Sequence, residues 1–227
     1  GFSFHDDYEA FHDILIDYQW DMCQIQLNIL DVEHQAGLKG LRLAGSLGIP
    51  VVIMEGLLGG SLVNAPEQVQ ALYDAFPIKR SSVEWAFRWL CNMEEVACVL
   101  SGVSSIEQTM DNLRIFDTVE VGCMSEEELA LIDKVRQAYE ARRKIGCTGC
   151  AYCMPCPGGV DIPGVFKLWN ERFKLNRPLA GNQPYADMKT EGKTVDHCLD
   201  CGACEEVCPQ HLPIREKLRC ANEDMDG

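Results

Sequence analysis

Short apolar runs and amphipathic segments alternate over residues 1–122. Runs of strand length lie at 22–27, 50–54 and 97–100, and residues 1–5 have the pattern of a strand end. Segments with apolar residues at helical spacing lie at 8–18, 34–47, 81–91 and 104–116. Strand–helix order of this kind predicts right-handed parallel units. Four strands do not close a barrel, so we expect an open half with two exposed edges.

A long helix is predicted over 125–144. Ser125 caps its start, and Glu128, three residues further on, completes a capping box. Three basic residues at 142–144 stand at its carboxyl end, where cations favour the helix dipole. This helix is expected to bridge two domains, so the predicted organisation is an α/β region at 1–122, a bridge at 123–144 and a second domain at 145–227.

Composition narrows the classes of function. The chain has 35 acidic against 20 basic residues and a net charge of −15, so it lacks the basic footprint that nucleic acid requires. No apolar stretch approaches the roughly 18 residues of a membrane span, and a signal peptide is not expected. An acidic surface would suit a basic redox partner protein, although a solvated acidic face is the simpler interpretation.

Thirteen cysteines are present, and eight of them fall in two tight tracts. The second tract, residues 198–209, has the bacterial ferredoxin spacing C-x2-C-x2-C-x3-C-P. The first tract, residues 147–157, reads C-x2-C-x2-C-x2-C-P and is one residue shorter before its last cysteine. Three thiolates at three-residue steps reach three corners of one 4Fe–4S cubane, while the cysteine before proline points to the other cluster. Because cluster thiolates must stay reduced, a cytoplasmic location is expected.

This geometry predicts two ligand sets that exchange one cysteine each. One set is Cys147, Cys150, Cys153 and Cys208, and the other is Cys198, Cys201, Cys204 and Cys156. The short spacing before Cys156 leaves open a different pairing or an incomplete site. Zinc is the alternative metal, although zinc sites usually pair two separated C-x2-C knuckles. Helices expected at 163–174 and 213–221 give the domain a resemblance to the α-helical ferredoxins. The five single cysteines are interpreted as small buried side chains or inert thiols.

Four segments in order resemble the C-terminal half of an aldo/keto reductase barrel. They are 1–3, 23–28, 48–57 and 100–105 with the helix that follows, and they look like that family's fifth to eighth strands. The resemblance covers residues 1 to about 143, and the cysteine domain matches the ferredoxin-bearing branch of the family. The implied fold is half of a TIM (β/α)8 barrel followed by a mostly α-helical ferredoxin-like 4Fe–4S domain.

The resemblance also implies a nicotinamide cofactor, NADP or NAD, and site residues for it. Ser3 and Gln24 match residues on the nicotinamide amide, and Met54 stands where the family often stacks an aromatic ring. The family's adenosine-side contacts are matched by Ser104, Gln108, Asp111 and Asn112. Residues 102–105 would form a strand-to-helix turn whose free N–H groups are aimed at a phosphate.

Departures from the family pattern matter. The catalytic aspartate, tyrosine, lysine and histidine lie on the family's first four strands, which this sequence does not contain, and His5 is not that histidine. Gly56 replaces a common proline, and Gly102 replaces a lysine that often contacts the 2′-phosphate. With no methionine at Gly1, the sequence is expected to be the C-terminal part of a longer protein.

The functional hypothesis is therefore an iron–sulfur oxidoreductase that reduces a small carbonyl-type substrate with a nicotinamide. This chain alone is expected to be inactive. A hydride carries two electrons and a cluster accepts one, so a flavin or a partner would have to split the pair. The alternative is a non-catalytic electron carrier on a barrel scaffold, and a zinc-stabilised interaction module is a third possibility.

Overall fold

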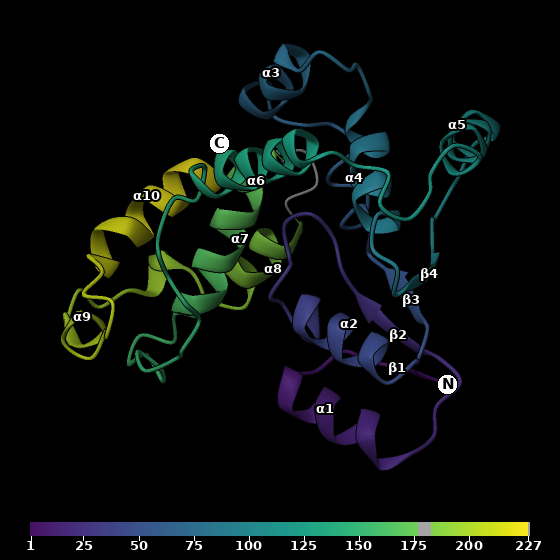
Figure 1. Ribbon diagram of the computed structural model, residues 1–227. Helices are drawn as coiled ribbons and strands as arrows, with labels where there is room; N and C mark the ends of the chain where they lie inside the picture. Colours follow the sequence, from purple (N-terminus) through teal and green to yellow (C-terminus); the bar gives the residue numbers. More distant parts are fainter. Residues whose placement is uncertain (177–182, 227) are drawn as a thin grey trace. The chain divides into compact units, whose positions relative to one another are not determined.

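The computed structural model describes residues 1–176 and 183–226 (Figure 1). It divides into two compact units, Gly1–Ala138 and Tyr139–Gly227. They are called unit 1 and unit 2 below. The predicted domain at 145–227 includes residues 177–182 and 227, which lie outside the described residues. Across the described part of the chain, no helix combines the length and apolarity needed to cross a membrane.

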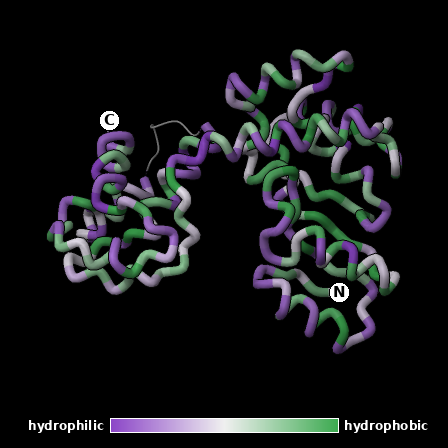
Figure 2. Tube along the Cα trace, turned by 60° about the vertical axis from the view of Figure 1, so that its left-hand side comes forward, coloured by the Kyte–Doolittle hydropathy of each residue, from purple (hydrophilic) through white to green (hydrophobic). Residues whose placement is uncertain are grey.

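A four-stranded parallel sheet forms the centre of unit 1. Its strands β1 (Phe2–Ser3), β2 (Cys23–Gln26), β3 (Val51–Met54) and β4 (Val96–Val99) lie in the order β1-β2-β3-β4. Each strand adds beside the previous one, as successive strand–helix units require. Cys23, Ile25, Val51 and Ile53 are fully buried along one face of β2 and β3, and Figure 2 shows this apolar centre in green. Strands β1 and β4 form the two edges, as predicted.

The helices of unit 1 follow the predicted alternation. They are α1 (Tyr8–Asp17), α2 (Gly37–Ser46), α3 (Glu67–Ala75), α4 (Ser82–Cys91), α5 (Ile106–Phe116) and most of α6 (Glu126–Glu140), whose last two residues belong to unit 2. Helix α2 begins at Gly37, three residues later than the predicted start. Helix α3 was not predicted, although Pro66 at its start and the buried Val69 and Tyr73 at helical spacing could have indicated it.

The predicted capping box at the start of α6 is confirmed. The amide of Glu128 donates to Ser125 Oγ at 3.3 Å, and the amide of Ser125 donates to Glu128 Oε2 at 2.8 Å. The helix ends at Glu140 rather than at Lys144. The amide of Arg142 turns back to the carbonyl of Tyr139, and Asn170 Oδ1 accepts from the amides of Lys144 and Ile145. The Asn170 side chain therefore takes two amides that a longer helix would have used.

Unit 2 is mostly helical, as predicted. It contains α7 (Ile162–Lys174), α8 (Gln183–Thr190), a 3-10 turn η1 (Val195–His197), α9 (Ala203–Glu206) and α10 (Ile214–Asp226). Asp161 caps α7 by accepting from the amide of Gly164 at 3.0 Å. Helix α10 continues past the predicted end near Ala221, because Leu218, Ala221 and Met225 keep one face of it buried in the core with Phe166 of α7.

Candidate functional site

The two cysteine tracts share one backbone conformation. In each tract the residue before the second cysteine and the residue after it have positive φ angles. These residues are Gly149 (73°) and Ala151 (60°) in the first tract, and Asp200 (54°) and Gly202 (79°) in the second. Left-handed residues at matching places let each tract turn tightly around its second cysteine. The two loops are therefore conformational copies, although their sequences differ.

The tracts differ after their third cysteine. In the second tract, Cys204 lies in the short helix α9, which leads to Cys208. In the first tract, the amide of Met154 closes a turn onto the carbonyl of Ala151 at 2.9 Å, and Cys156 follows one residue sooner. A turn that contains Pro155 therefore takes the place of the helical turn of the second tract. This turn accounts for the spacing that is one residue shorter before Cys156.

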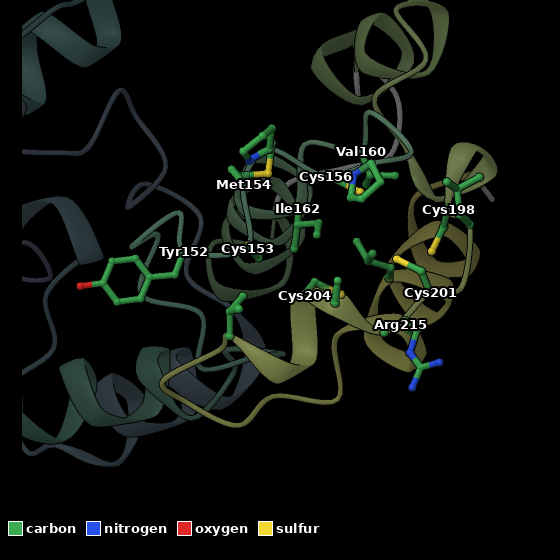
Figure 3. Close-up of a pocket in the computed structure, with 17 residues that line it drawn as sticks. Tyr152, Cys153, Met154, Cys156, Val160, Ile162, Cys198, Cys201, Cys204 and Arg215 are labelled. Atoms are coloured by element: carbon green, nitrogen blue, oxygen red, sulfur yellow. The ribbon is translucent and has the colours of Figure 1, made fainter.

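Two cavities lie against these loops. The first-tract cavity, about 20 Å³, is bordered by Cys147, Cys150, Cys153 and Cys208. The second-tract cavity, about 180 Å³, is bordered by Cys153, Cys156, Cys198, Cys201 and Cys204, and Figure 3 shows these side chains around it. The last cysteine of each tract therefore lies at the cavity of the opposite tract, while Cys153 stands between the two.

The two tracts pack directly against each other at Gly158. A Cβ atom built on Gly158 would lie 2.2 Å from the carbonyl oxygen of His197, the residue before Cys198. No side chain tolerates that approach to backbone. Downstream, the amide of Asp161 donates to the carbonyl of Lys193 at 2.9 Å. A glycine is required here because the exit of the first tract lies on the entry of the second.

An ion-pair network holds the second tract on α10. Arg215 donates from Nε and Nη2 to Glu205 Oε2 at 3.1 and 2.8 Å, and from Nη1 to the carbonyl of Asp200 at 3.2 Å. Arg219 donates to the Asp200 carboxylate at 2.7 Å. The Arg215 side chain and backbone bonds lower the pKa of Glu205. The network therefore fixes the loop that carries Cys201 and Cys204, with the Arg215 guanidinium pointing out of the cavity (Figure 3).

Burial changes the pKa of two thiols of the tracts. It raises the pKa of Cys204 to about 11, with a further contribution from the Glu205 carboxylate, and it also raises the pKa of Cys153. Thiols with raised pKa values are protonated at neutral pH. Binding of metal to them must therefore release protons.

The donor set fits iron–sulfur clusters. Soft thiolates are the ligands that Fe–S clusters take, and four cysteines border each cavity once Cys153 is counted with the first. Thiols spread around the wall of a cavity suit a cubane, which presents one iron to each thiolate.

In unit 1, three of the predicted nicotinamide residues lie together: Ser3 and Met54 end β1 and β3, and Gln24 is the second residue of β2 between them. The Gln24 amide donates to Ser3 Oγ at 3.3 Å and to the sulfur of Met54 at 3.5 Å. Ser3 and Gln24 are paired in the register of β1 and β2. His5 is exposed just beyond β1. This group offers one amide and one hydroxyl at an open edge of the sheet.

The predicted adenosine-side residues line a separate groove of about 600 Å³. Ser104, Gln108, Asp111 and Asn112 form one wall with the end of β4, and residues of the loop after β3 form the other. One of the amides expected to be free, that of Ser104, is already engaged. Ser104 N–H donates to Gln108 Oε1 at 2.8 Å, and Gln108 N–H donates to Ser105 Oγ at 3.2 Å. Side chains of the helix itself therefore cap the start of α5.

The five single cysteines differ in burial, and three of them, Cys91, Cys123 and Cys220, are partly buried. Cys23 is fully buried in β2, as expected, and burial raises its pKa to about 11. Cys98 is exposed on β4, so of the two interpretations given above it is not a buried side chain. It is exposed because β4 is an edge strand with no neighbour beyond it within unit 1.

Comparisons with known proteins bear on both units. Residues 146–212 match the family model of the 4Fe-4S dicluster domain. Over 45 residues the chain is 49% identical to the acetyl-CoA decarbonylase/synthase complex subunit alpha 1 of Methanopyrus kandleri, a match that covers 19% of this chain and 6% of that protein.

Among solved structures, the aldo-keto reductase AKR11C1 from Bacillus halodurans is similar in its holo and apo forms. The TM-scores are 0.49 and 0.48, the identities are 22% and 21%, and the matches cover 60% and 59% of this chain. In both cases the chain spans 49% of the matched structure's length.

The match to the family model identifies the fold of unit 2. The match over 146–212 contains both cysteine tracts, so this part of the chain is a 4Fe–4S dicluster domain of the ferredoxin type. The predicted fold class, a parallel α/β region followed by a mostly helical 4Fe–4S domain, is confirmed.

Proposed function

We propose that this chain is part of an iron–sulfur oxidoreductase in which unit 2 carries two 4Fe–4S clusters. The observation that carries the proposal is the exchange of cysteines between tracts, which gives each of two cavities a full set of thiols. Clusters of this kind supply one-electron transfer.

The ligand sets follow from the cavities. Cys147, Cys150, Cys153 and Cys208 hold one cluster, and Cys198, Cys201, Cys204 and Cys156 hold the other. Cys153 borders both cavities, and it is assigned to the first set because its own loop carries Cys147 and Cys150. The chain's part in the chemistry is to supply thiolates, to turn backbone N–H groups towards sulfur, and to keep water from the buried Cys208.

Unit 1 is the proposed nicotinamide-binding half. Ser3 and Gln24 present hydrogen-bonding groups that suit a carboxamide, and Met54 offers an apolar surface beside them. The groove beside α5 has the size and position for the adenosine end, since ligands bind parallel sheets at the carboxyl ends of their strands. The proposed reaction is reduction of a small carbonyl-type substrate. The compartment that suits reduced thiolates is the cytoplasm.

A proton donor for such a reaction is proposed to come from outside this sequence. Carbonyl reduction needs a donor within hydrogen-bond reach of the carbonyl oxygen. The tyrosines of α1 and α3 make other contacts. The Lys39 ammonium nitrogen lies 3.6 Å from the centroid of the Tyr8 ring, and Tyr73 is buried against Trp85. We therefore expect this chain alone to leave carbonyl substrates unreduced.

The test is oxidation of NADH or NADPH with a panel of aldehydes, by this chain and by one extended upstream until a barrel of eight strands is complete. Activity only in the extended chain, weakened by Gln24→Ala through a higher KM for the nicotinamide, is the expected result. Activity in the short chain would show that the proton donor is local, with His5 as the first residue to replace.

The second candidate function is a non-catalytic electron carrier, with unit 1 as scaffold. The observation in its favour is that unit 2 holds complete thiol sets without help from unit 1. A basic redox partner protein would suit the charge of −15. Inactivity of both chains in the assay above, with the clusters intact and reducible by dithionite, would favour the carrier.

A further inference from the structure

Two thiols of unit 1 that belong to neither cysteine tract are brought together by the fold. Cys91 is the last residue of α4, and Cys123 lies in the segment that leads into α6. Both side chains are partly buried. Residues 92–122, which separate them in the sequence, include β4 and α5. Contacts between the end of α4 and the segment before α6 therefore decide whether the two thiols can meet.

Asn92 bonds the segment around Cys123 to the end of α4. The amide of Gly122 donates to the Asn92 carbonyl at 3.0 Å, and the amide of Met124 donates to Asn92 Oδ1 at 2.9 Å. Gly122 and Met124 are the neighbours of Cys123 on either side, and Asn92 directly follows Cys91. One residue therefore accepts bonds from both sides of Cys123 and holds it beside the last turn of α4.

Further contacts agree with this placement. Arg88, one turn before the end of α4, donates from Nη2 to Thr118 Oγ1 at 2.8 Å, so the segment runs along the helix end. Burial, then the Cys123 thiol and then the Cys98 thiol raise the pKa of Cys91 to about 11. A neighbouring group of like charge has this effect only at short range. Of the two thiols, Cys123 acts on Cys91 more strongly than Cys98 does.

We propose that Cys91 and Cys123 form a reversible disulfide when the chain meets a small disulfide oxidant such as glutathione disulfide. The bond closes a loop over residues 92–122, and this loop contains the edge strand β4 and helix α5. Disulfides of a reducing compartment are transient and respond to oxidants. The pair is therefore a redox-sensitive clamp on one edge of unit 1, and it does not depend on the function proposed above.

The exchange proceeds in two steps. The Cys123 thiolate attacks one sulfur of glutathione disulfide, which forms a mixed disulfide and releases one glutathione thiolate. The Cys91 thiolate then attacks Cys123 Sγ and releases the second glutathione, and the two cysteine protons pass to the two glutathione thiolates. Two thiols are oxidised and one disulfide is reduced. Cys123 reacts first, because Cys91 is protonated at neutral pH and because Val121 beside Cys123 is 61% exposed.

Peptide mapping of the anaerobically purified chain tests the disulfide. The chain is incubated with glutathione disulfide, its free thiols are alkylated, and it is digested with trypsin. Cys91 and Cys98 then lie on peptide 89–114 and Cys123 lies on peptide 115–134, whereas the tracts of unit 2 fall on other peptides. We expect a cross-link between these two peptides in most chains, and dithiothreitol should reverse it. Cys98→Ser should keep the cross-link and Cys91→Ser should lose it.

Hydrogen exchange measures the clamp itself. A disulfide that closes a loop of this length should slow the exchange of the α5 amides by about tenfold or more. Chains in which both thiols remain alkylated under excess glutathione disulfide would overturn the proposal. A cross-link that survives in Cys91→Ser and disappears in Cys98→Ser would overturn the pairing. Equal exchange of α5 in the reduced and oxidised chains would overturn the clamp.

Discussion

The two units build their sites in opposite ways. In unit 2, thiols from two loops enclose cavities, and the loops touch at Gly158 with no room for a side chain. In unit 1, the groove and the Ser3–Gln24 pair lie at open strand ends, and their polar groups bond to one another. The metal site is therefore fixed by close packing and spacing, whereas the groove is formed by separate polar side chains.

This difference has a consequence for mutation. A site that depends on ligands and on close backbone contact loses its function when one atom is added or removed. A site that depends on several separate polar contacts changes by degrees, because each contact contributes only part of the binding. We expect all-or-none effects in unit 2 and graded effects in unit 1.

The largest effect is expected from the cysteines before proline. Cys208→Ala removes a thiol from the first-tract cavity and Cys156→Ala removes one from the second-tract cavity. Each variant should lose one cluster and fall to about half the iron. Iron analysis with EPR of the dithionite-reduced protein would show which cluster remains.

Cys220→Ala is the matched control. Cys220 packs against the core of unit 2 but lines neither cavity, so its replacement should leave the iron content unchanged. The proposed exchange of ligands would be wrong if Cys208→Ala damaged the cluster of its own tract and spared the other.

Gly158→Ala should damage the domain without touching a ligand. The added methyl meets the carbonyl of His197 at 2.2 Å, so the tracts must move apart at a cost of about 1–3 kcal/mol. We expect a lower Tm and clusters that are lost on gel filtration. Gly146→Ala has open space around its Cβ and should behave like the unchanged chain. Equal Tm values for the two variants would contradict the close packing of the tracts.

Alkaline pH should weaken unit 1 through Cys23. Burial raises the pKa of this thiol to about 11, above the roughly 8.5 of an unfolded cysteine. The folded state holds its proton more tightly, so this contribution is complete below about pH 8.5 and is lost as the pH rises towards 11, by up to about 3 kcal/mol. Urea unfolding of the anaerobic protein at pH 8 and pH 11 measures it. In Cys23→Ala the free energy of unfolding should differ less between pH 8 and pH 11 than in the unchanged chain. An equal difference in both proteins would exclude Cys23 as its source.

The smallest effect is expected from the network on α10. Arg215→Gln removes two bonds to Glu205 and one to the carbonyl of Asp200, and the loss of stability should be small because the side chain is partly exposed. The cluster of the second tract should then degrade faster in air, followed by its visible absorbance. Arg219→Gln, which loses a single exposed bond, should change the rate less. If the cluster degraded at the same rate in both variants, Arg215 would not be the residue that stabilises the second tract.

Much of unit 2 was predictable from the sequence, since thiolate spacing is short-range. The ferredoxin pattern and the Cys-Pro pairs indicated the clusters and their exchange of ligands. The contact of Gly158 with His197 was not predictable, because it joins residues far apart in the sequence. Neither was the network of Arg215, since ion pairs of this kind leave no periodic signal.

In unit 1 the strands and most helices were predictable, because apolar residues at helical spacing can be told apart from the short apolar runs of strands. Helix α3 was missed because its apolar stripe is short and follows a glycine-rich loop. The groove beside α5 could not be predicted: Glu55 and Asp111 face one space only after the strand ends are brought together. The capped start of α5 was also missed, since the Gln108 amide oxygen competes for the amide expected to be free.

Iron and acid-labile sulfide in the anaerobically purified chain test the central claim most directly. Two clusters require about eight of each per chain, with the broad absorption of 4Fe–4S centres that dithionite bleaches. About four of each would mean that only one cavity fills, with the short spacing before Cys156 as the cause. A colourless protein with two zinc ions would contradict the account.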